Sequence, residues 1–181
     1  MRKILKVILI VIVVLAVTTL IGVGLCFSDV AAYTATGSKT LSPRSASVGK
    51  AIVVYDPGFS GAAHSIAQKI ANDLQAKGYT VTLAGIKSSA AAHTSGYSVI
   101  VVGGPIYGGR PTSSVDAFLR NLNPTQATRI GVFGSGSFNV PTDKVAVLPK
   151  NSNLTITYST KILSSDIQSV RCQDFVNQLL K

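Results

Sequence analysis

The chain has few of the residues that build metal centres and disulfide frameworks. Its 181 residues include two cysteines, two histidines and seven acidic side chains. Cys26 lies in an apolar run near the N-terminus and Cys172 lies near the C-terminus, so they predict no intrachain disulfide framework and leave the cellular compartment undecided. His64 and His93 have no cysteine or carboxylate at ligand spacing beside them, so the sequence predicts no metal site.

Charge is missing from one long stretch. Residues 7–27, VILIVIVVLAVTTLIGVGLCF, carry no charged side chain, and as a helix they would reach about 32 Å, enough to cross the hydrocarbon core of a bilayer. We therefore predict a transmembrane anchor over residues 1–27. A cleaved signal peptide is the alternative, because VAA at residues 30–32 is a small-residue cleavage site, but the run exceeds the roughly 7 to 15 residues of a signal core.

Basic residues flank this run unequally. Arg2, Lys3 and Lys6 precede it, whereas the next basic residue after it is Lys39. Because positively charged flanks stay in the cytoplasm during insertion, the asymmetry predicts the amino terminus inside and the rest of the chain on the extracytoplasmic face.

The segment after the anchor differs in composition from everything around it. Residues 28–49 are rich in Ser, Thr, Ala and Gly and show no apolar periodicity. This composition predicts a flexible linker between the anchor and a domain that covers residues 50–181.

Residues 50–181 alternate between two kinds of pattern. Five short apolar runs are typical of strands, at residues 51–55, 79–83, 97–103, 129–134 and 154–159. Segments with helical spacing lie at residues 62–78, 112–122 and 164–181. The alternation predicts an α/β fold with a doubly wound, five-stranded parallel sheet joined by right-handed crossovers.

Glycine and serine gather in three loops of this predicted sheet. DPGFSGAAHS follows the first strand, GGPIYGGRPTS the third and GSGSF the fourth. Parallel α/β sheets bind ligands beyond the carboxyl ends of their strands, so these loops form the candidate binding edge.

The first two of these loops suggest complementary ends of one ligand. The first leads into a helix N-terminus, which favours a phosphate; simple helix capping is the alternative. The third-strand loop places Tyr107 between glycines too small to cover it, where it could stack on a flat ring; a tyrosine lying back on its own loop is the alternative. Flavin mononucleotide (FMN) has this combination of phosphate and ring.

Two runs of the sequence resemble a known family. YSVIVVGGPIYGGRPTSSVDAFL is similar to the third strand and aromatic loop of flavodoxins, and VVYDPGFSGAAHSIAQKIANDL to their first strand, phosphate loop and first helix. The resemblance covers residues 50–181 and none of the anchor. It implies a flavodoxin-like sheet of order 2-1-3-4-5 that carries FMN at its carboxyl edge.

The resemblance also implies the residues that hold the cofactor. They form a phosphate loop, an aromatic loop whose tyrosine stacks on the ring, and a segment on the other side of the ring. These are Gly58, Phe59, Ser60, Gly61, Ala62 and Ala63; Pro105, Ile106, Tyr107, Gly108 and Gly109; and Gly134, Ser135, Gly136 and Ser137.

The sequence departs from the family at its phosphate loop and in its charge. Gly58 and Ala63 stand where the family has Thr or Ser, and the loop is about one residue longer. If each lost hydroxyl bond is worth about 1 kcal/mol, FMN affinity falls by one to two orders of magnitude. From Lys50 onward the chain has 12 Lys or Arg against 6 Asp, whereas soluble flavodoxins are usually acidic.

These features favour a membrane-anchored flavodoxin-like protein that binds FMN and transfers electrons, as a carrier or as an FMN-dependent oxidoreductase. A flavin-free binding module of the same fold and a quinone-linked flavodoxin-like dehydrogenase are the alternatives. We expect the partner to be a redox protein or membrane quinone, with the membrane reached through the N-terminal helix, and no nucleic acid. The basic balance suits an acidic partner or anionic headgroups, or is scattered solubilising charge.

Overall fold

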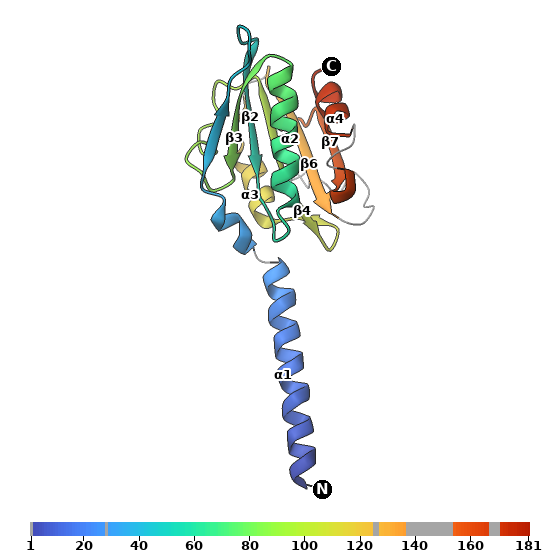
Figure 1. The fold of residues 1–181 in the computed structure, drawn as a ribbon. Helices are drawn as coiled ribbons and strands as arrows, with labels where there is room; N and C mark the ends of the chain where they lie inside the picture. Colours follow the sequence, from blue (N-terminus) through green and yellow to red (C-terminus); the bar gives the residue numbers. More distant parts are fainter. Residues whose placement is uncertain (1, 28, 125–126, 137–153, 167–170) are drawn as a thin grey trace.

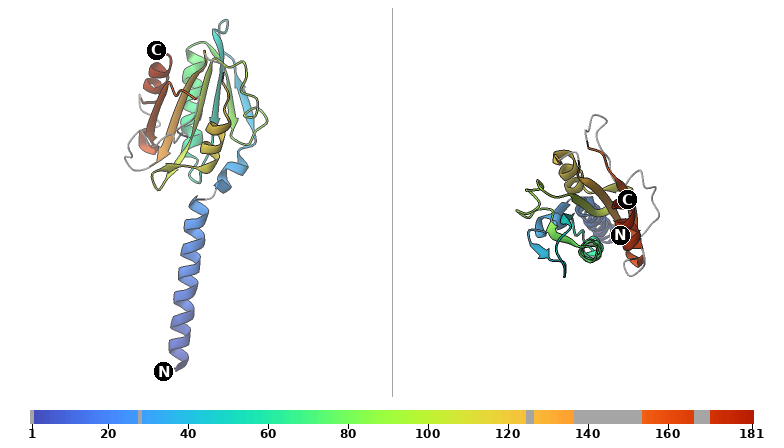
Figure 2. Two further views of the ribbon diagram at one scale, coloured as in Figure 1. Left: turned by 180° about the vertical axis from the view of Figure 1, so that it is seen from behind. Right: turned by 90° about the horizontal axis from the view of Figure 1, so that it is seen from above.

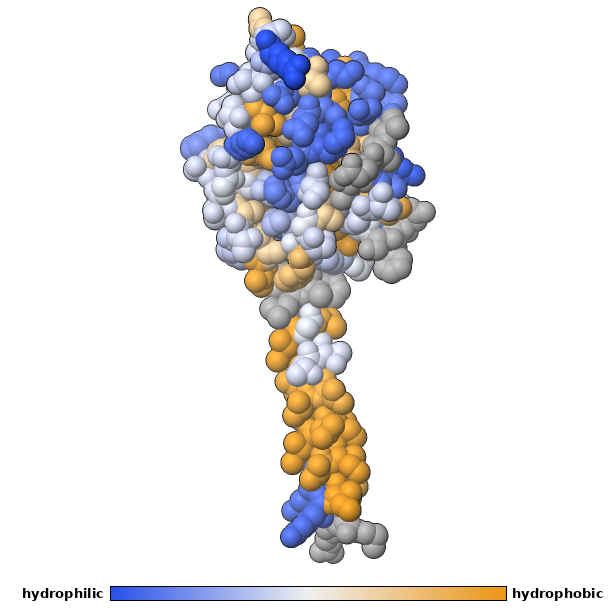
Figure 3. Space-filling model, viewed as in Figure 1, coloured by the Kyte–Doolittle hydropathy of each residue, from blue (hydrophilic) through white to orange (hydrophobic). Residues whose placement is uncertain are grey.

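A long helix and an α/β domain make up the molecule (Figure 1). The structure is a computed structural model, and it describes residues 2–27, 29–124, 127–136, 154–166 and 171–181. The long helix is α1 (Arg2–Phe27). Its stretch Lys3–Gly24 is long and apolar enough to cross a membrane, with a mean hydropathy of 3.1 and none of the window buried against the protein. Figure 3 shows its nearly continuous hydrophobic surface.

Five parallel strands form the centre of the domain. In chain order they are β2 (Gly49–Tyr55), β3 (Tyr79–Gly85), β4 (Val99–Tyr107), β6 (Arg129–Gly136) and β7 (Tyr158–Leu163). Their spatial order is β3-β2-β4-β6-β7, and every neighbouring pair among them is parallel. This is the order 2-1-3-4-5, so the expected flavodoxin-like fold class is confirmed.

Helices cover both faces of the sheet (Figures 1 and 2). On one face α2 (Ala62–Ala76) and α4 (Arg171–Leu179) pack against side chains such as Val53, Val101 and Phe133. On the other, α3 (Ser113–Asn121) packs against Ile100 and Val102. Because both faces are covered, the central strands are continuous apolar runs rather than alternating ones.

The segment expected to be a flexible linker differs from that expectation. Its first part is a 3₁₀ helix, η1 (Asp29–Thr34), and its middle is β1 (Ser38–Leu41), which pairs antiparallel with β3 at the edge of the sheet. Ala32 is fully buried in the core on the α3 side. A segment rich in small residues is expected to be flexible when nothing packs against it. In this protein the small side chains let the segment lie close against the sheet.

The fifth parallel strand begins later than its sequence pattern predicts. The expected strand was residues 154–159, whereas β7 covers Tyr158–Leu163, in register with Gly131–Gly136. Leu154 and Ile156 instead pack, partly buried, on the core beside α3. Residues 154–159 alternate between apolar and polar side chains, as a strand would, whereas Ser159, Thr160 and Lys161 in β7 are consecutive polar residues, so the local pattern favoured the wrong start.

Gly103 offers a direct test of how tightly the sheet is packed. A Cβ atom at this position would overlap the ring of Phe133 on the neighbouring strand. We expect Gly103→Ala to lower the free energy of unfolding by about 3 kcal/mol, because a core this dense cannot absorb a methyl group. A Cβ at Gly37 meets nothing within 4 Å, so Gly37→Ala serves as the matched control in urea unfolding. Equal stability of the two variants would contradict this packing.

Candidate functional site

Tyr107 lies at the last position of β4, beside a tight hairpin. It pairs with Arg110, the first residue of β5 (Arg110–Pro111). The two residues between them, Gly108 and Gly109, have φ values of 56° and 80°. A two-residue hairpin turn of type I′ needs positive φ at both central positions, which glycine supplies at little cost. The glycines therefore fold β4 back at Tyr107.

The side chain of Tyr107 reaches the phosphate loop. The backbone N–H of Phe59 donates a hydrogen bond to the Tyr107 hydroxyl at 3.2 Å, and the rings of Phe59 and Tyr107 lie 6.2 Å apart at 39°. Tyr107 is half-buried and Phe59 is exposed. The aromatic loop and the phosphate loop, 48 residues apart in sequence, thus meet at one edge of the sheet.

Two backbone N–H groups at the start of α2, next to the phosphate loop, are unpaired. The N-cap Gly61 has φ 70° and makes no side-chain cap, and Ala62 N–H donates to Ser60 Oγ. Among the described residues, the N–H groups of Ala63 and His64 have no partner. The first turn of α2 has no acidic residue. Free N–H groups and the helix dipole suit a phosphate, so this end of the site fits FMN.

The structure explains the two departures from the flavodoxin phosphate loop. Gly58 has φ 60°, and a Cβ there would lie 2.7 Å from Pro105 and 3.0 Å from the Tyr107 hydroxyl. Ala63 is fully buried in the core under α2. A threonine would be strained at the first position, and at the second its hydroxyl would enter an apolar core. The loop is therefore built around backbone donors.

Asp56, directly after β2, is a buried side chain that connects several parts of this edge of the sheet. Its side chain is 1% exposed. Oδ1 accepts a hydrogen bond from Gly58 N–H at 3.0 Å, and Oδ2 accepts from the hydroxyls of Thr112 at 2.8 Å and Ser114 at 2.6 Å. The last two residues lie at the N-terminus of α3, whose dipole favours a negative charge. Asp56 thus links the phosphate loop to α3.

The segment expected on the other side of the ring begins beside the aromatic loop. Ser135 on β6 is in register with Pro105 on β4, and a Cβ at Gly136 would lie 3.7 Å from the Ile106 carbonyl oxygen. Gly134, Ser135 and Gly136 therefore line up with the start of the aromatic loop. Ser137 lies outside the described residues.

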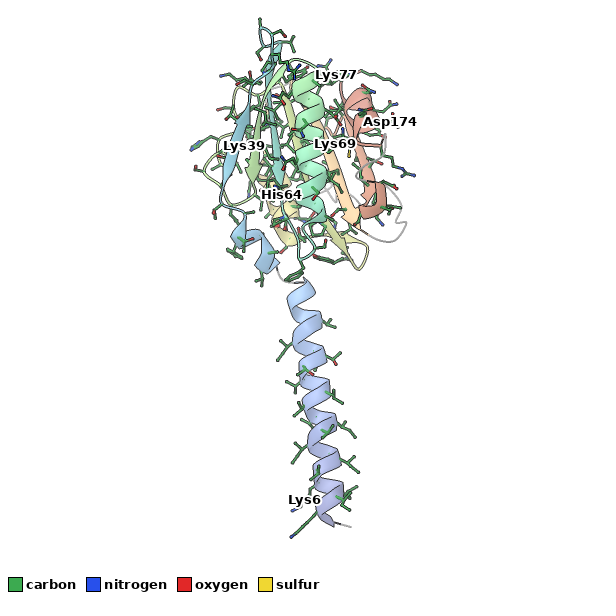
Figure 4. The ribbon with its side chains drawn as sticks, viewed as in Figure 1. Lys6, Lys39, His64, Lys69, Lys77 and Asp174 are labelled. Atoms are coloured by element: carbon green, nitrogen blue, oxygen red, sulfur yellow. The ribbon has the colours of Figure 1, made fainter. Side chains whose placement is uncertain are left out.

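Two further side chains near this edge gave no signal in the sequence. Lys161 on β7 is 7% exposed, its Nζ lies 3.5 Å from the Cβ position of Gly136, and burial lowers the pKa of this ammonium group. His64 stacks on Tyr55 with ring centroids 4.7 Å apart, and it lies in the part of α2 nearer α1 (Figure 4). Among the described residues, no three His, Cys, Asp or Glu side chains group to hold a metal ion.

A surface hollow of about 470 Å³ borders the hairpin. Tyr107, Arg110, Thr112 and Asp116 are among the residues that line it. This volume is in the range of small-ligand sites, and it leaves space beside Tyr107 at the start of α3.

Comparisons with known proteins found similar solved structures but no matching family. No protein-family model matches the chain, and the comparison with curated proteins gave no match. A solved flavodoxin from the domain Archaea is similar at 18% identity, over 73% of this chain and 99% of its own, with a TM-score of 0.49. Oxidised Flavodoxin 2 from Bacillus cereus is similar at 20% identity, over 72% and 97%, with a TM-score of 0.47. The fold assignment itself rests on the strand order and register described above.

The Asp56 network predicts a large effect of removing one carboxylate. Asp56→Ala would remove the shared acceptor of the half-buried Gly58 N–H and of the buried Thr112 and Ser114 hydroxyls, so we expect the free energy of unfolding to fall by about 3 kcal/mol. Asp174, exposed in the first turn of α4, makes Asp174→Ala the control, with a small fraction of that loss. The measurement is urea unfolding at neutral pH. Asp56→Ala as stable as Asp174→Ala would contradict the linking role.

Proposed function

We propose that the chain is a membrane-anchored flavodoxin-like protein that binds FMN without a covalent bond and transfers electrons. The observation that carries the proposal is the meeting of the two loops: Phe59 N–H bonds the Tyr107 hydroxyl beside a helix N-terminus with unpaired N–H groups. FMN carries a phosphate and a flat ring, and these features suit its two ends.

Each end of the cofactor would be held by this chain's own groups. The N–H groups of Ala63 and His64 would bind the phosphate, together with the Ser60 hydroxyl. The Phe59 N–H would join them when Tyr107 releases it. The ring of Tyr107 would then be available to stack, with Gly134–Gly136 on the other side. Bound FMN supplies the electron transfer, and the protein supplies orientation and electrostatics.

Charge near the ring would come from Lys161. It is the buried cation beside Gly136, and positive charge near a flavin stabilises its negatively charged forms. The soluble domain carries 12 basic residues against 6 acidic ones, so a protein partner would dock through an acidic surface.

A second candidate function is a quinone-linked dehydrogenase. The observation that favours it is the position of the loops: α1 joins the domain at the end where the parallel strands finish (Figure 1). A cofactor at that edge would lie close to lipid-soluble electron carriers.

Two substitutions at Tyr107 test the cofactor proposal. Tyr107→Phe keeps the ring and frees the Phe59 N–H, so we expect FMN to bind as tightly as to the unaltered protein or more tightly. Tyr107→Ala removes the stacking surface, worth about 1 kcal/mol, so binding should weaken by roughly five- to tenfold. The measurement is quenching of FMN fluorescence on titration, with the unaltered protein binding at about 1 μM or tighter.

The opposite result favours the flavin-free module. A purified protein without visible absorbance that leaves FMN fluorescence unchanged would reject the cofactor proposal. Binding that is equally tight in the Tyr107→Ala and Tyr107→Phe variants would reject the role of the ring while leaving a phosphate site.

The flanking charges predict the sidedness of the domain. With Arg2, Lys3 and Lys6 before the span, the positive-inside rule puts the domain on the extracytoplasmic face. Protease added to intact cells should remove the domain and spare a cytoplasmic control protein. A domain that is digested only after lysis would reverse the topology and place electron transfer in the cytoplasm.

A further inference from the structure

The chain enters the domain at the carboxyl edge of the sheet. One residue separates the end of α1 from η1, and η1 is fixed to the domain through the buried Ala32, which packs in the core beside α3. Just beyond it, Lys87 N–H donates to the Ala35 carbonyl at 2.9 Å. Lys87 follows β3, so this attachment lies where a parallel strand ends.

The phosphate loop lies at the same end. In Figure 4, His64 in the first turn of α2 is nearer to α1 than Lys69, and Lys77 after the last turn is farthest away. Phe59 precedes α2 by three residues, so it lies on the side of the domain that faces the anchor.

Exposed apolar side chains are concentrated at this end. Outside α1, four large ones are strongly exposed among the described residues: Val30 at 47%, Tyr33 at 70%, Val48 at 68% and Phe59 at 51%. Val30 and Tyr33 belong to η1, and Phe59 to the phosphate loop. Only Val48 lies at the opposite end, next to Gly78 and before β2. Figure 3 shows hydrophobic surface on the domain next to α1.

We propose that the carboxyl edge of the domain rests on the bilayer, with Val30, Tyr33 and Phe59 in contact with the headgroup region. The proposal rests on the membrane anchoring proposed above. Val30 is three residues from the end of α1, so it lies at most about 11 Å along the chain from the apolar span. Aromatic and apolar side chains at that depth enter the boundary between headgroups and acyl chains.

A cation near the junction of α1 and the domain supports the same lipid contact. Lys87 Nζ lies 4.9 Å from the centroid of the Tyr33 ring, and Lys87 is exposed. A ring with a cation beside it is a typical interfacial pair, in which the ring reaches the acyl boundary and the cation reaches lipid phosphates. In this arrangement the domain contacts lipid, and the carboxyl edge of the sheet, which holds the candidate FMN site, faces the membrane.

The absence of tryptophan from the chain makes a sharp experiment possible. Phe59→Trp and Val48→Trp each introduce a single tryptophan, at opposite ends of the domain, that can be excited apart from the tyrosines. The full chain is reconstituted in nanodiscs of anionic and zwitterionic lipid, with or without bromine on the acyl chains near the headgroup. Brominated lipid should quench Phe59→Trp and leave Val48→Trp unchanged. Aqueous iodide should quench Val48→Trp several-fold more than Phe59→Trp.

Other results separate the two proposals. Equal iodide quenching of both variants, with no effect of brominated lipid on either, would overturn the lipid contact. Extraction of the unaltered chain from vesicles by alkaline carbonate would overturn the anchoring itself. If Phe59→Trp is degraded on expression, Tyr33→Trp takes its place, because Tyr33 is exposed in η1 and the same two outcomes apply to it.

Discussion

The buried carboxylate of Asp56 is the interaction on which the candidate site depends. It accepts hydrogen bonds from Gly58, Thr112 and Ser114, and so it joins the end of β2 to the start of α3, across the neighbouring β4. A buried carboxylate is stable only with such donors. The same bonds hold Gly58 where its backbone meets Pro105 and Tyr107. Together with the Phe59–Tyr107 hydrogen bond, they fix the phosphate loop against the aromatic hairpin.

The two residues at which the phosphate loop differs from the flavodoxin pattern have structural roles of their own. In the sequence, Gly58 and Ala63 stand where the flavodoxin pattern has a Thr or Ser hydroxyl. In the structure, Gly58 takes a left-handed conformation against Pro105, and Ala63 fills the core beneath α2. Donors for an anion come from the backbone, which needs no particular side chain. In the proposed complex, backbone N–H groups at the start of α2 would bind the phosphate whatever side chains stand at these two positions.

The sequence predicted the parts of the fold that local patterns encode. Apolar runs and helical spacing located β2, β3, β4, β6 and the helices α2 and α3, because burial on both faces leaves a continuous apolar signal. Local patterns did not encode the edge strand β1, whose Ser and Thr residues carry no apolar signal. The shifted start of β7 depends on its register with β6. The role of Asp56 depends on partners 56 and 58 residues away, which no window of sequence contains.

The most direct test of the central claim is the ¹H–¹⁵N spectrum of the full chain in nanodiscs, recorded with and without FMN. The account predicts that the amide signals of Ser60, Ala63 and His64 shift together with those of Gly108 and Gly109, because one ligand touches both loops. The signal of Gly78, at the far end of α2, should stay in place. A spectrum that FMN leaves unchanged, or one that changes only away from these two loops, would contradict the account.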